Sequence, residues 1–337
     1  MSETIYNRRR SITGRANLGR FTLANKVTLG SGRFAYDVVE NWEKLPEDIG
    51  WRETAGVITD ADDNVYVFSR GDHPMVVFDK DGNFIKTWGE GVFTRAHGVS
   101  VGPDNTLYCT DDGDHTVRQC TLDGEVLMTI GVPNEPAAAH SNKPFNRCTH
   151  VATDPANGDL FVSDGYGNGN VHKFTPDGEH ITTWGSPGVD AGQFNIVHNI
   201  ATDRDGYVYV CDRENHRVQV FDRDGKLEDV WYHLHRPCAI YISDDQRVYV
   251  GELGFGMAVN RYTPNIGPRV AILNTAGKVL DRLGNGYGLD AGQFIAPHGI
   301  CLDSEDSIYV AEVAHTNISH NETPPPNVRA FQKLAKA

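Results

Sequence analysis

The most regular feature of the chain is a pattern of apolar and polar residues that repeats six times. Each copy contains a strand of small residues, an Asp/Asn/Gly turn, an alternating apolar strand, a loop and a third strand, which leads through Asp-Gly into a fourth. The last copy is incomplete. Asp-Gly between alternating apolar runs is a strong hairpin signal, and repeats of roughly 40–50 residues with four strands are typical of propeller blades. The pattern therefore predicts an all-β, six-bladed β-propeller. The copies occupy residues 56–89, 98–131, 151–185, 199–231, 239–284 and 299–313 onward.

The sixth copy is one strand short at its C-terminal end. After the Pro-rich segment 323–326 it offers only 328–334 as a further strand. Segment 34–43 is also strand-like and has no other place in the pattern. We predict that it forms the outer strand of the last blade, because this pairing closes the ring and removes exposed sheet edges. The predicted organisation is an N-terminal arm over 1–30 and one propeller domain over 31–337.

Composition and charge exclude several classes of partner. The formal net charge of -14 argues against nucleic acid, which needs a basic surface. No apolar run is long enough to span a membrane, and the N-terminal segment lacks the apolar core of a signal peptide. The six cysteines include no CxxC pair. We therefore expect a reduced, soluble, cytoplasmic protein, whose oligomeric state the sequence leaves open.

Histidine recurs at one position of the repeat. Taken in chain order, the residues that enter the six innermost strands are Ala55, His97, Thr149, His198, Cys238 and His298. Histidine thus occupies every second blade, and small residues occupy the others. In a six-bladed ring this alternation places three imidazoles evenly around the central axis. Three neutral imidazoles with an open coordination position suit a catalytic zinc-like ion. We therefore predict that His97, His198 and His298 bind one catalytic metal ion, Zn²⁺ or another divalent transition metal such as Fe or Co.

A second repeat position, at the end of the second strand, lies on the same face of the ring as these histidines. Its residues are Arg70, Asp112, Gly165, Arg213, Leu253 and Val313, with Tyr166 directly after Gly165. Guanidinium groups bind carboxylates through paired hydrogen bonds, so Arg70 and Arg213 predict a small carboxylate-bearing substrate. Nearby positive charge favours a phenolate, which makes Tyr166 a candidate general base. The alternatives are surface salt bridges for the arginines and a rim aromatic for Tyr166.

Several segments resemble one family. The repeats are similar to NHL-type blades, and six motifs resemble the catalytic domain of peptidyl-α-hydroxyglycine α-amidating lyase over essentially residues 50–315. These motifs are FSRGDHP (68–74), AHGVSV (96–101), VSDGYGNGNV (162–171), VHNIATD (197–203), CDRENHRVQVF (211–221) and APHGI (296–300).

The resemblance implies a metal-dependent C–N lyase that cleaves an α-hydroxyglycine-type (carbinolamide) substrate to an amide and glyoxylate. In the family, a base takes the proton of the carbinol hydroxyl while arginines hold the carboxylate. The positions of the family's zinc ligands match His97, His198 and His298. Those of its substrate-cavity arginines match Arg70 and Arg213, and that of its proposed base matches Tyr166.

Some positions depart from the family. Gly299 stands where an Asp linked to a structural calcium is typical, which puts structural Ca²⁺ in doubt, and Ala296 replaces a Met. The positions of the disulfides in the secreted enzymes look like Gly167, Tyr209 and Val220 here. These departures favour a cytoplasmic relative that acts on small N-acyl or ureido derivatives of hydroxyglycine rather than on peptides.

Two other functions stay open at this point. The first is a metal-dependent hydrolase or lactonase of a small carboxylate-bearing substrate. Lactonase-type propellers gather Glu, Asn and Asp on the axis, however, whereas this sequence offers three histidines. The second is a non-catalytic NHL interaction module, which predicts no axial metal and a basic or aromatic surface stripe.

Overall fold

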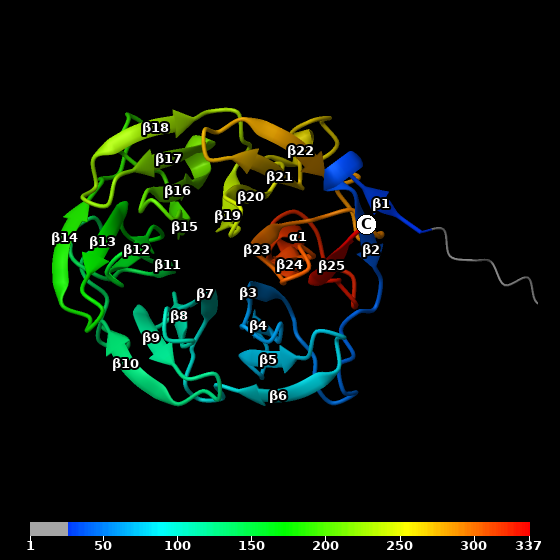
Figure 1. Cartoon of the computed structure of the whole chain (residues 1–337), viewed down its shortest axis with the longest axis horizontal. Helices are drawn as coiled ribbons and strands as arrows, with labels where there is room; N and C mark the ends of the chain where they lie inside the picture. The colour runs from blue at the N-terminus through cyan, green and yellow to red at the C-terminus, as the bar shows by residue number, and fades with distance from the viewer. Residues whose placement is uncertain (1–25) are drawn as a thin grey trace, which may run out of the picture.

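Six antiparallel sheets stand in a ring around a central axis in the computed structural model, which describes residues 26–337 (Figure 1). The first strand of each sheet lies nearest the axis, and the later strands follow outward. This arrangement confirms the predicted all-β, six-bladed propeller. The predicted N-terminal arm over 1–30 lies mostly outside the described residues.

Blades one to five each contain four consecutive strands. Blades one and two consist of β3 (Thr54–Thr59), β4 (Val65–Ser69), β5 (Met75–Phe78), β6 (Phe84–Trp88), β7 (Ala96–Val101), β8 (Leu107–Asp111), β9 (Thr116–Cys120) and β10 (Val126–Ile130). Blades three and four consist of β11 (Cys148–Thr153), β12 (Leu160–Asp164), β13 (Asn170–Phe174), β14 (His180–Trp184), β15 (Val197–Thr202), β16 (Val208–Asp212), β17 (Arg217–Phe221) and β18 (Leu227–Trp231). Blade five consists of β19 (Pro237–Ile242), β20 (Arg247–Glu252), β21 (Arg269–Asn274) and β22 (Val279–Leu283).

Blade six joins the two ends of the chain. It runs from β23 (Pro297–Leu302) and β24 (Ile308–Glu312) through β25 (Phe331–Lys336) to β2 (Tyr36–Val39) and β1 (Thr28–Leu29). Strand β2 pairs with β25 in antiparallel register, which confirms the predicted closure by segment 34–43. The remaining elements are the short helix α1 (Ala314–Ser319) and the 3-10 turns Gly32–Phe34, Arg213–Asn215 and Ala258–Asn260.

Neighbouring blades interlock through the tryptophans and glycines of the repeat. The Asp-Gly turn of blade two packs on the last strand of blade one, so that a Cβ on Gly124 would lie 2.7 Å from the ring of Trp88. The same contact recurs around the ring. The other pairs are Gly82 with Trp42, Gly225 with Trp184 and Gly277 with Trp231. A side chain at Gly124, Gly225 or Gly277 would collide with the indole, and one at Gly82 would lie 1.9 Å from the main-chain oxygen of Trp42. This close packing is one reason why glycine recurs at these turns.

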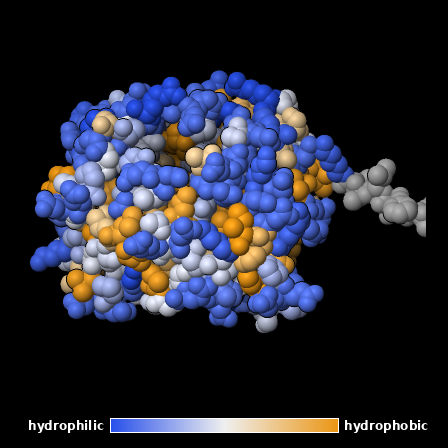
Figure 2. All heavy atoms as spheres, turned by 60° about the horizontal axis from the view of Figure 1, so that its bottom comes forward, coloured by the Kyte–Doolittle hydropathy of each residue, from blue (hydrophilic) through white to orange (hydrophobic). Residues whose placement is uncertain are grey.

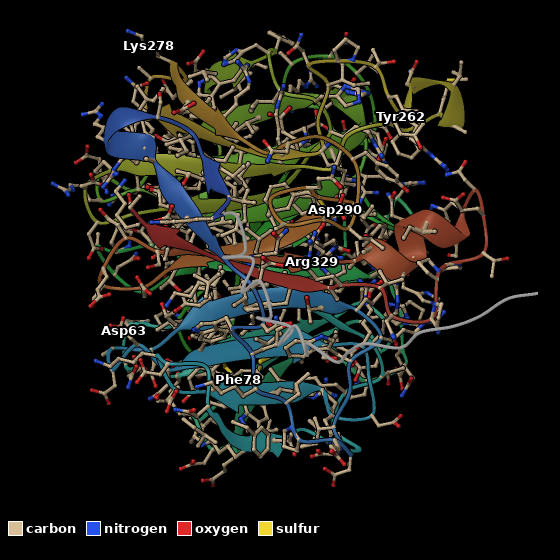
Figure 3. All side chains as sticks on the ribbon, turned by 90° about the vertical axis from the view of Figure 1, so that its right-hand side faces the viewer. Asp63, Phe78, Tyr262, Lys278, Asp290 and Arg329 are labelled. Atoms are coloured by element: carbon tan, nitrogen blue, oxygen red, sulfur yellow. The ribbon has the colours of Figure 1, made fainter. Side chains whose placement is uncertain are left out.

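The core is a series of apolar clusters between adjacent blades, and all six cysteines are buried and outside disulfides. The outer surface in Figure 2 is mainly hydrophilic, with scattered hydrophobic residues. Among the described residues no helix has the length and apolar character needed to cross a membrane. Seen from the side, α1 projects from one face of the ring, the face that also carries Tyr262, while Asp63 lies on the opposite face (Figure 3).

Candidate active site

Each innermost strand begins with an irregularity in its pairing. In all six blades the register between the first and second strands shifts at the position that carries histidine in alternate blades. In blade two the shift falls between Ala96 and Val99, and in blade six between Pro297 and Gly299. A β-bulge turns a side chain away from the regular alternation of a strand. The repeat therefore supplies six bulged positions next to the axis, three of which hold histidine.

The three histidines meet at the axis. The ring centroids of His97, His198 and His298 lie 4.6 to 4.9 Å apart, and one ring nitrogen of each lies within 4.8 Å of the other two. All three side chains are buried. Within residues 26–337 this is the only group of His, Cys, Asp or Glu with such convergence. The structure thus brings together the histidines that the repeat alignment selects.

Each of these imidazoles is oriented by the blade that follows it. Its Nδ1 lies within hydrogen-bond distance of the main-chain carbonyl at the equivalent bulged position of the next blade. Because a carbonyl can only accept, Nδ1 carries the proton and Nε2 keeps its lone pair. The acceptors are Thr149 O for His97 at 2.7 Å, Cys238 O for His198 at 2.7 Å and Ala55 O for His298 at 2.6 Å.

The histidines have the charge state that a metal ligand needs. Burial lowers the pKa of each imidazole well below its ordinary value, and the charges of Arg213 near His198 and Arg70 near His298 lower the pKa of those two further. They are therefore neutral at pH 7. Neutral imidazoles with the far nitrogen fixed by a carbonyl are the usual ligands of a divalent transition metal. This cluster could therefore hold one such ion and leave further positions open.

Glycine follows two of the three histidines because the next blade approaches closely. A Cβ on Gly98 would lie 2.5 Å from Thr149 O, the acceptor for His97. A Cβ on Gly299 would lie 2.8 Å from Gly56 Cα. An aspartate at 299, which the family resemblance would lead one to expect, therefore has no room unless main-chain atoms move.

We expect Gly299→Ala to lower the free energy of unfolding by roughly 1–3 kcal/mol, because the new methyl group would press on main-chain atoms that cannot rotate away. Chemical denaturation followed by fluorescence measures this change. Gly50→Ala is the matched control, since nothing lies within 4 Å of a Cβ at 50. Equal stability of the two variants would contradict the close packing of blades one and six.

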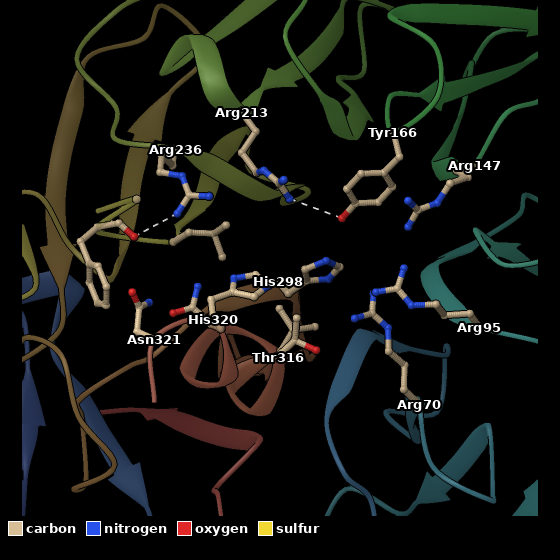
Figure 4. A pocket seen from close by; sticks show the side chains of 15 residues that line it. Arg70, Arg95, Arg147, Tyr166, Arg213, Arg236, His298, Thr316, His320 and Asn321 are labelled. Carbon is tan, nitrogen blue, oxygen red and sulfur yellow. Dashed lines mark hydrogen bonds between the residues drawn. The ribbon is translucent and has the colours of Figure 1, made fainter. Parts of the chain in front are cut away.

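Tyr166 places its hydroxyl beside the histidines. Its Oη lies 3.2 Å from Nε2 of His97 and 3.2 Å from Nε2 of His198. Arg213 Nη1 donates to the same oxygen at 3.4 Å (Figure 4). Gly165, just before Tyr166, has no room for a side chain, because a Cβ there would lie 1.7 Å from Val197 O. The turn after β12 therefore places the Tyr166 hydroxyl beside the Nε2 atoms of His97 and His198.

Arg213 is held by a network that the sequence did not reveal. Its Nε donates to Glu214 Oε1 at 2.8 Å. Arg236 binds both oxygens of Glu214 and donates through Nη1 to Phe255 O. Burial alone would raise the pKa of Glu214, but Arg236 and Arg213 lower it to about 2. The carboxylate therefore stays charged and orients Arg213 toward Tyr166.

Arg70 is oriented in a similar way on the other side of the axis. Its Nη1 donates to Glu53 Oε1 at 2.8 Å and its Nε to Ala96 O at 2.9 Å, while Nη2 is buried and has no hydrogen-bond partner among residues 26–337. Glu53 also accepts hydrogen bonds from the backbone and side chain of Thr316, which lies on α1. The α1 segment is thereby attached to the ring, and one amino group of Arg70 is left to bind a ligand.

A cavity of about 390 Å³ opens above the histidines. Four of the six predicted site residues line it, namely Arg70, Tyr166, Arg213 and His298. It also includes three further arginines, Arg95, Arg147 and Arg236, and residues of the α1 segment such as Thr316 and His320 (Figure 4).

The three further arginines share a third repeat position, which was not among the two positions aligned in the sequence. They stand two residues before the bulged position, where the six blades carry Glu53, Arg95, Arg147, Ile196, Arg236 and Ala296. In five of the six blades the backbone oxygen at this position accepts a hydrogen bond from the end of the second strand. The residues at this position and those at the end of the second strand are thus neighbours in space. Aligning this position in the sequence as well would have identified the three further arginines.

The cavity carries an excess of positive charge. Its five arginines pair with three carboxylates, those of Glu53, Asp112 and Glu214. With the three histidines neutral, two positive charges remain without an acidic partner. An anionic ligand is the complement of such a site.

Comparisons with known proteins agree with this architecture. An NHL repeat family model matches residues 194–221. The chain is 27% identical over 322 residues to peptidyl-glycine alpha-amidating monooxygenase B of Xenopus laevis, which covers 81% of this chain and 35% of that protein. It is 28% identical over 226 residues to human NHL repeat-containing protein 3, which covers 64% of each chain. It is 30% identical over 258 residues to peptidyl-alpha-hydroxyglycine alpha-amidating lyase 1 of Drosophila melanogaster, which covers 67% of this chain and 44% of that protein.

The chain therefore spans less than two thirds of the length of each of these relatives. The NHL match covers β15, β16 and β17 of blade four. This part of the blade contains His198 and Arg213. The matches to the amidating proteins extend over most of the propeller. The chain is an NHL-repeat β-propeller that is related in sequence to the peptidyl-α-hydroxyglycine α-amidating lyases.

Proposed function

We propose that this protein is a metal-dependent C–N lyase that cleaves an N-substituted α-hydroxyglycine to an amide and glyoxylate. The observation that carries the proposal is the position of the Tyr166 hydroxyl, 3.2 Å from the Nε2 atoms of two of the three clustered histidines and hydrogen-bonded to Arg213. A candidate base, a candidate metal site and a carboxylate-binding group thus converge on one point. The sequence relationship to amidating lyases supports the same chemistry.

The chain's own residues would divide the work as follows. Arg70 and Arg213 would hold the substrate carboxylate, with Nη2 of Arg70 offering a buried donor that has no protein partner. Tyr166, in its ionised form, would take the proton of the carbinol hydroxyl. The electron pair of that O–H bond would form the C=O of glyoxylate, and the C–N bond would break. The nitrogen would then take the proton back from Tyr166 and leave as the amide, so that no proton is gained or lost overall.

His97, His198 and His298 would hold the divalent ion, and zinc is the ion that their number and type suit best. When bound, such an ion supplies Lewis-acid polarisation of an oxygen substituent. Burial of the three imidazoles and the carbonyl bonds at Nδ1 keep their ligating nitrogens unprotonated and fixed.

The cavity favours a small anionic substrate. Its volume of about 390 Å³ lies at the lower end of the range for small-molecule sites, and its excess positive charge matches a carboxylate. Small N-acyl or ureido derivatives of hydroxyglycine fit both properties.

We expect the purified protein to release glyoxylate from α-hydroxyhippurate, with one glyoxylate formed for each benzamide. Colorimetric detection of glyoxylate together with chromatography of benzamide measures both products. Chelator treatment should abolish the release, and added Zn²⁺ should restore it.

A lactone such as glucono-1,5-lactone serves as the comparison substrate. Hydrolysis of the lactone without cleavage of α-hydroxyhippurate would contradict the proposal and favour a hydrolase. Absence of turnover and of bound transition metal, in protein never exposed to chelator, would favour an interaction module instead.

A further inference from the structure

We propose that the substrate carries a second carboxylate, on its N-acyl side, which binds to Arg95 and Arg147. This inference rests on the proposed function and names the substrate class of the same site. The inner pair, Arg70 and Arg213, would hold the hydroxyglycine carboxylate, and the outer pair would hold the second anion.

The arginines of the cavity lie in two layers. Only 8% of the Arg70 side chain and 11% of the Arg213 side chain is exposed, whereas 35% of the Arg95 and 40% of the Arg147 side chains are exposed. The inner pair therefore faces the reacting centre. The outer pair is the more exposed of the two, and Figure 4 shows Arg147 beside Tyr166 and Arg95 beside Arg70.

The outer pair has one positive charge more than its acidic partners. Arg95 and Arg147 both donate to the same atom, Oδ2 of the buried Asp112. Within residues 26–337 the two guanidinium groups make no other hydrogen bond. Two guanidinium groups thus share one carboxylate. Their other N–H groups are available in the cavity, and an excess of one charge matches a monoanionic carboxylate better than a phosphate dianion.

The outer pair is close to the reacting centre. The guanidinium carbon of Arg147 lies 4.6 Å from the centre of the Tyr166 ring, whose hydroxyl contacts the histidines. The guanidinium carbon of Arg213 lies 5.6 Å from the centre of the same ring, so Tyr166 lies between Arg147 and an arginine of the inner pair (Figure 4). A chain of two or three carbons between the acyl carbonyl and the second carboxylate would therefore direct that carboxylate toward the outer pair.

The backbone at Arg147 is held in an unusual conformation. Its φ of 65° lies in the left-handed region, which a non-glycine residue seldom adopts. Ile196 and Arg236, at the same position of other blades, share this conformation, so it belongs to the repeat rather than to Arg147 alone. The N–H of Arg147 donates to His115 Nδ1 at 3.1 Å, which stabilises the conformation, and its side chain lines the cavity.

Arg236, which lines the same cavity as Arg95 and Arg147, does not share their role. Its Nε and Nη2 bind the two oxygens of Glu214, and its Nη1 donates to Phe255 O. These contacts use all three nitrogens, and they position Glu214 against Arg213. Arg236 is therefore a positioning residue rather than part of the second subsite.

The test uses two unreactive ligands that lack the carbinol hydroxyl, N-succinylglycine and the nearly isosteric, neutral-tailed N-succinamoylglycine. Isothermal titration calorimetry with the metal-loaded protein should show the succinyl compound binding about tenfold or more tightly, the size expected of one charge-assisted pair. The double variant Arg95→Gln/Arg147→Asn should lose this preference and keep its affinity for the succinamoyl compound. Asparagine is chosen at 147 because it tolerates the left-handed conformation.

Arg223→Gln, which removes a partly exposed arginine paired with Asp154 outside the cavity, should keep the preference. If the double variant fails to fold, as judged by circular dichroism and metal content, Arg95→Gln alone should lose part of it. Equal binding of the two compounds by the wild-type protein, or a preference that survives in the folded variants, would overturn the second subsite. Failure to cleave α-hydroxyhippurate with the preference intact would overturn only the proposed function.

Discussion

Tyr166→Phe is expected to lower kcat for α-hydroxyhippurate by about 10²-fold or more while the metal content stays unchanged. The hydroxyl lies 3.2 Å from the Nε2 atoms of His97 and His198 and accepts a hydrogen bond from Arg213, so its removal takes away the proposed base. Phenylalanine keeps the aromatic ring beneath Arg147, and the three histidines are untouched. Steady-state kinetics together with elemental analysis of the same sample measure both quantities.

The matched control is Tyr232→Phe, because Tyr232 is exposed and outside the cavity. Its kcat should equal that of the wild-type protein. An unchanged kcat in Tyr166→Phe would remove this tyrosine from the chemistry. Loss of metal in the same variant would instead assign the hydroxyl to the metal site.

His198→Ala is expected to weaken metal binding by a factor on the order of 10² or more and to abolish glyoxylate release. The substitution removes one of three imidazoles and leaves Cys238 O, its buried acceptor, without its donor. Because the other two imidazoles keep their carbonyl bonds, the ring should still fold. Titration with a competing chelator measures the affinity, and circular dichroism checks the fold.

His180→Ala is the control for this prediction, since His180 is exposed on strand β14 at the outer edge of its blade. It should bind metal and release glyoxylate like the wild-type protein. Full metal content and activity in His198→Ala would reject the three-histidine site.

The sequence predicted the ring and the histidines because both depend on features that recur. Alternating strands, Asp-Gly turns and the Trp-Gly ends are local and repeat in several blades, so six blades follow from them. The alternation of His97, His198 and His298 needs only correct alignment of the repeats. The closing strand was found because one blade lacked a strand and segment 34–43 was left over.

The rest of the site depends on contacts between segments that are distant in sequence. Glu53 contacts Arg70 of its own blade and Thr316 of α1, and Glu214 contacts Arg236 of the next blade. These pairings do not recur from blade to blade, although Glu53 and Arg236 stand at one repeat position. The α1 segment precedes the Pro-rich segment 323–326, and the repeat pattern gives no signal for a helix there.

The carbonyl bonds of the three imidazoles divide the propeller into three pairs of blades. In each pair the even-numbered blade contributes the imidazole, and the blade that follows contributes a main-chain oxygen. Any amino acid supplies that oxygen, so the bond to the imidazole does not itself require a particular side chain at 55, 149 or 238. The side chain at 149 has a separate role, because the Thr149 hydroxyl donates to His198 O at 2.6 Å. The side chain at 238 also contacts an imidazole, since Cys238 Sγ lies 3.3 Å from His198 Nδ1.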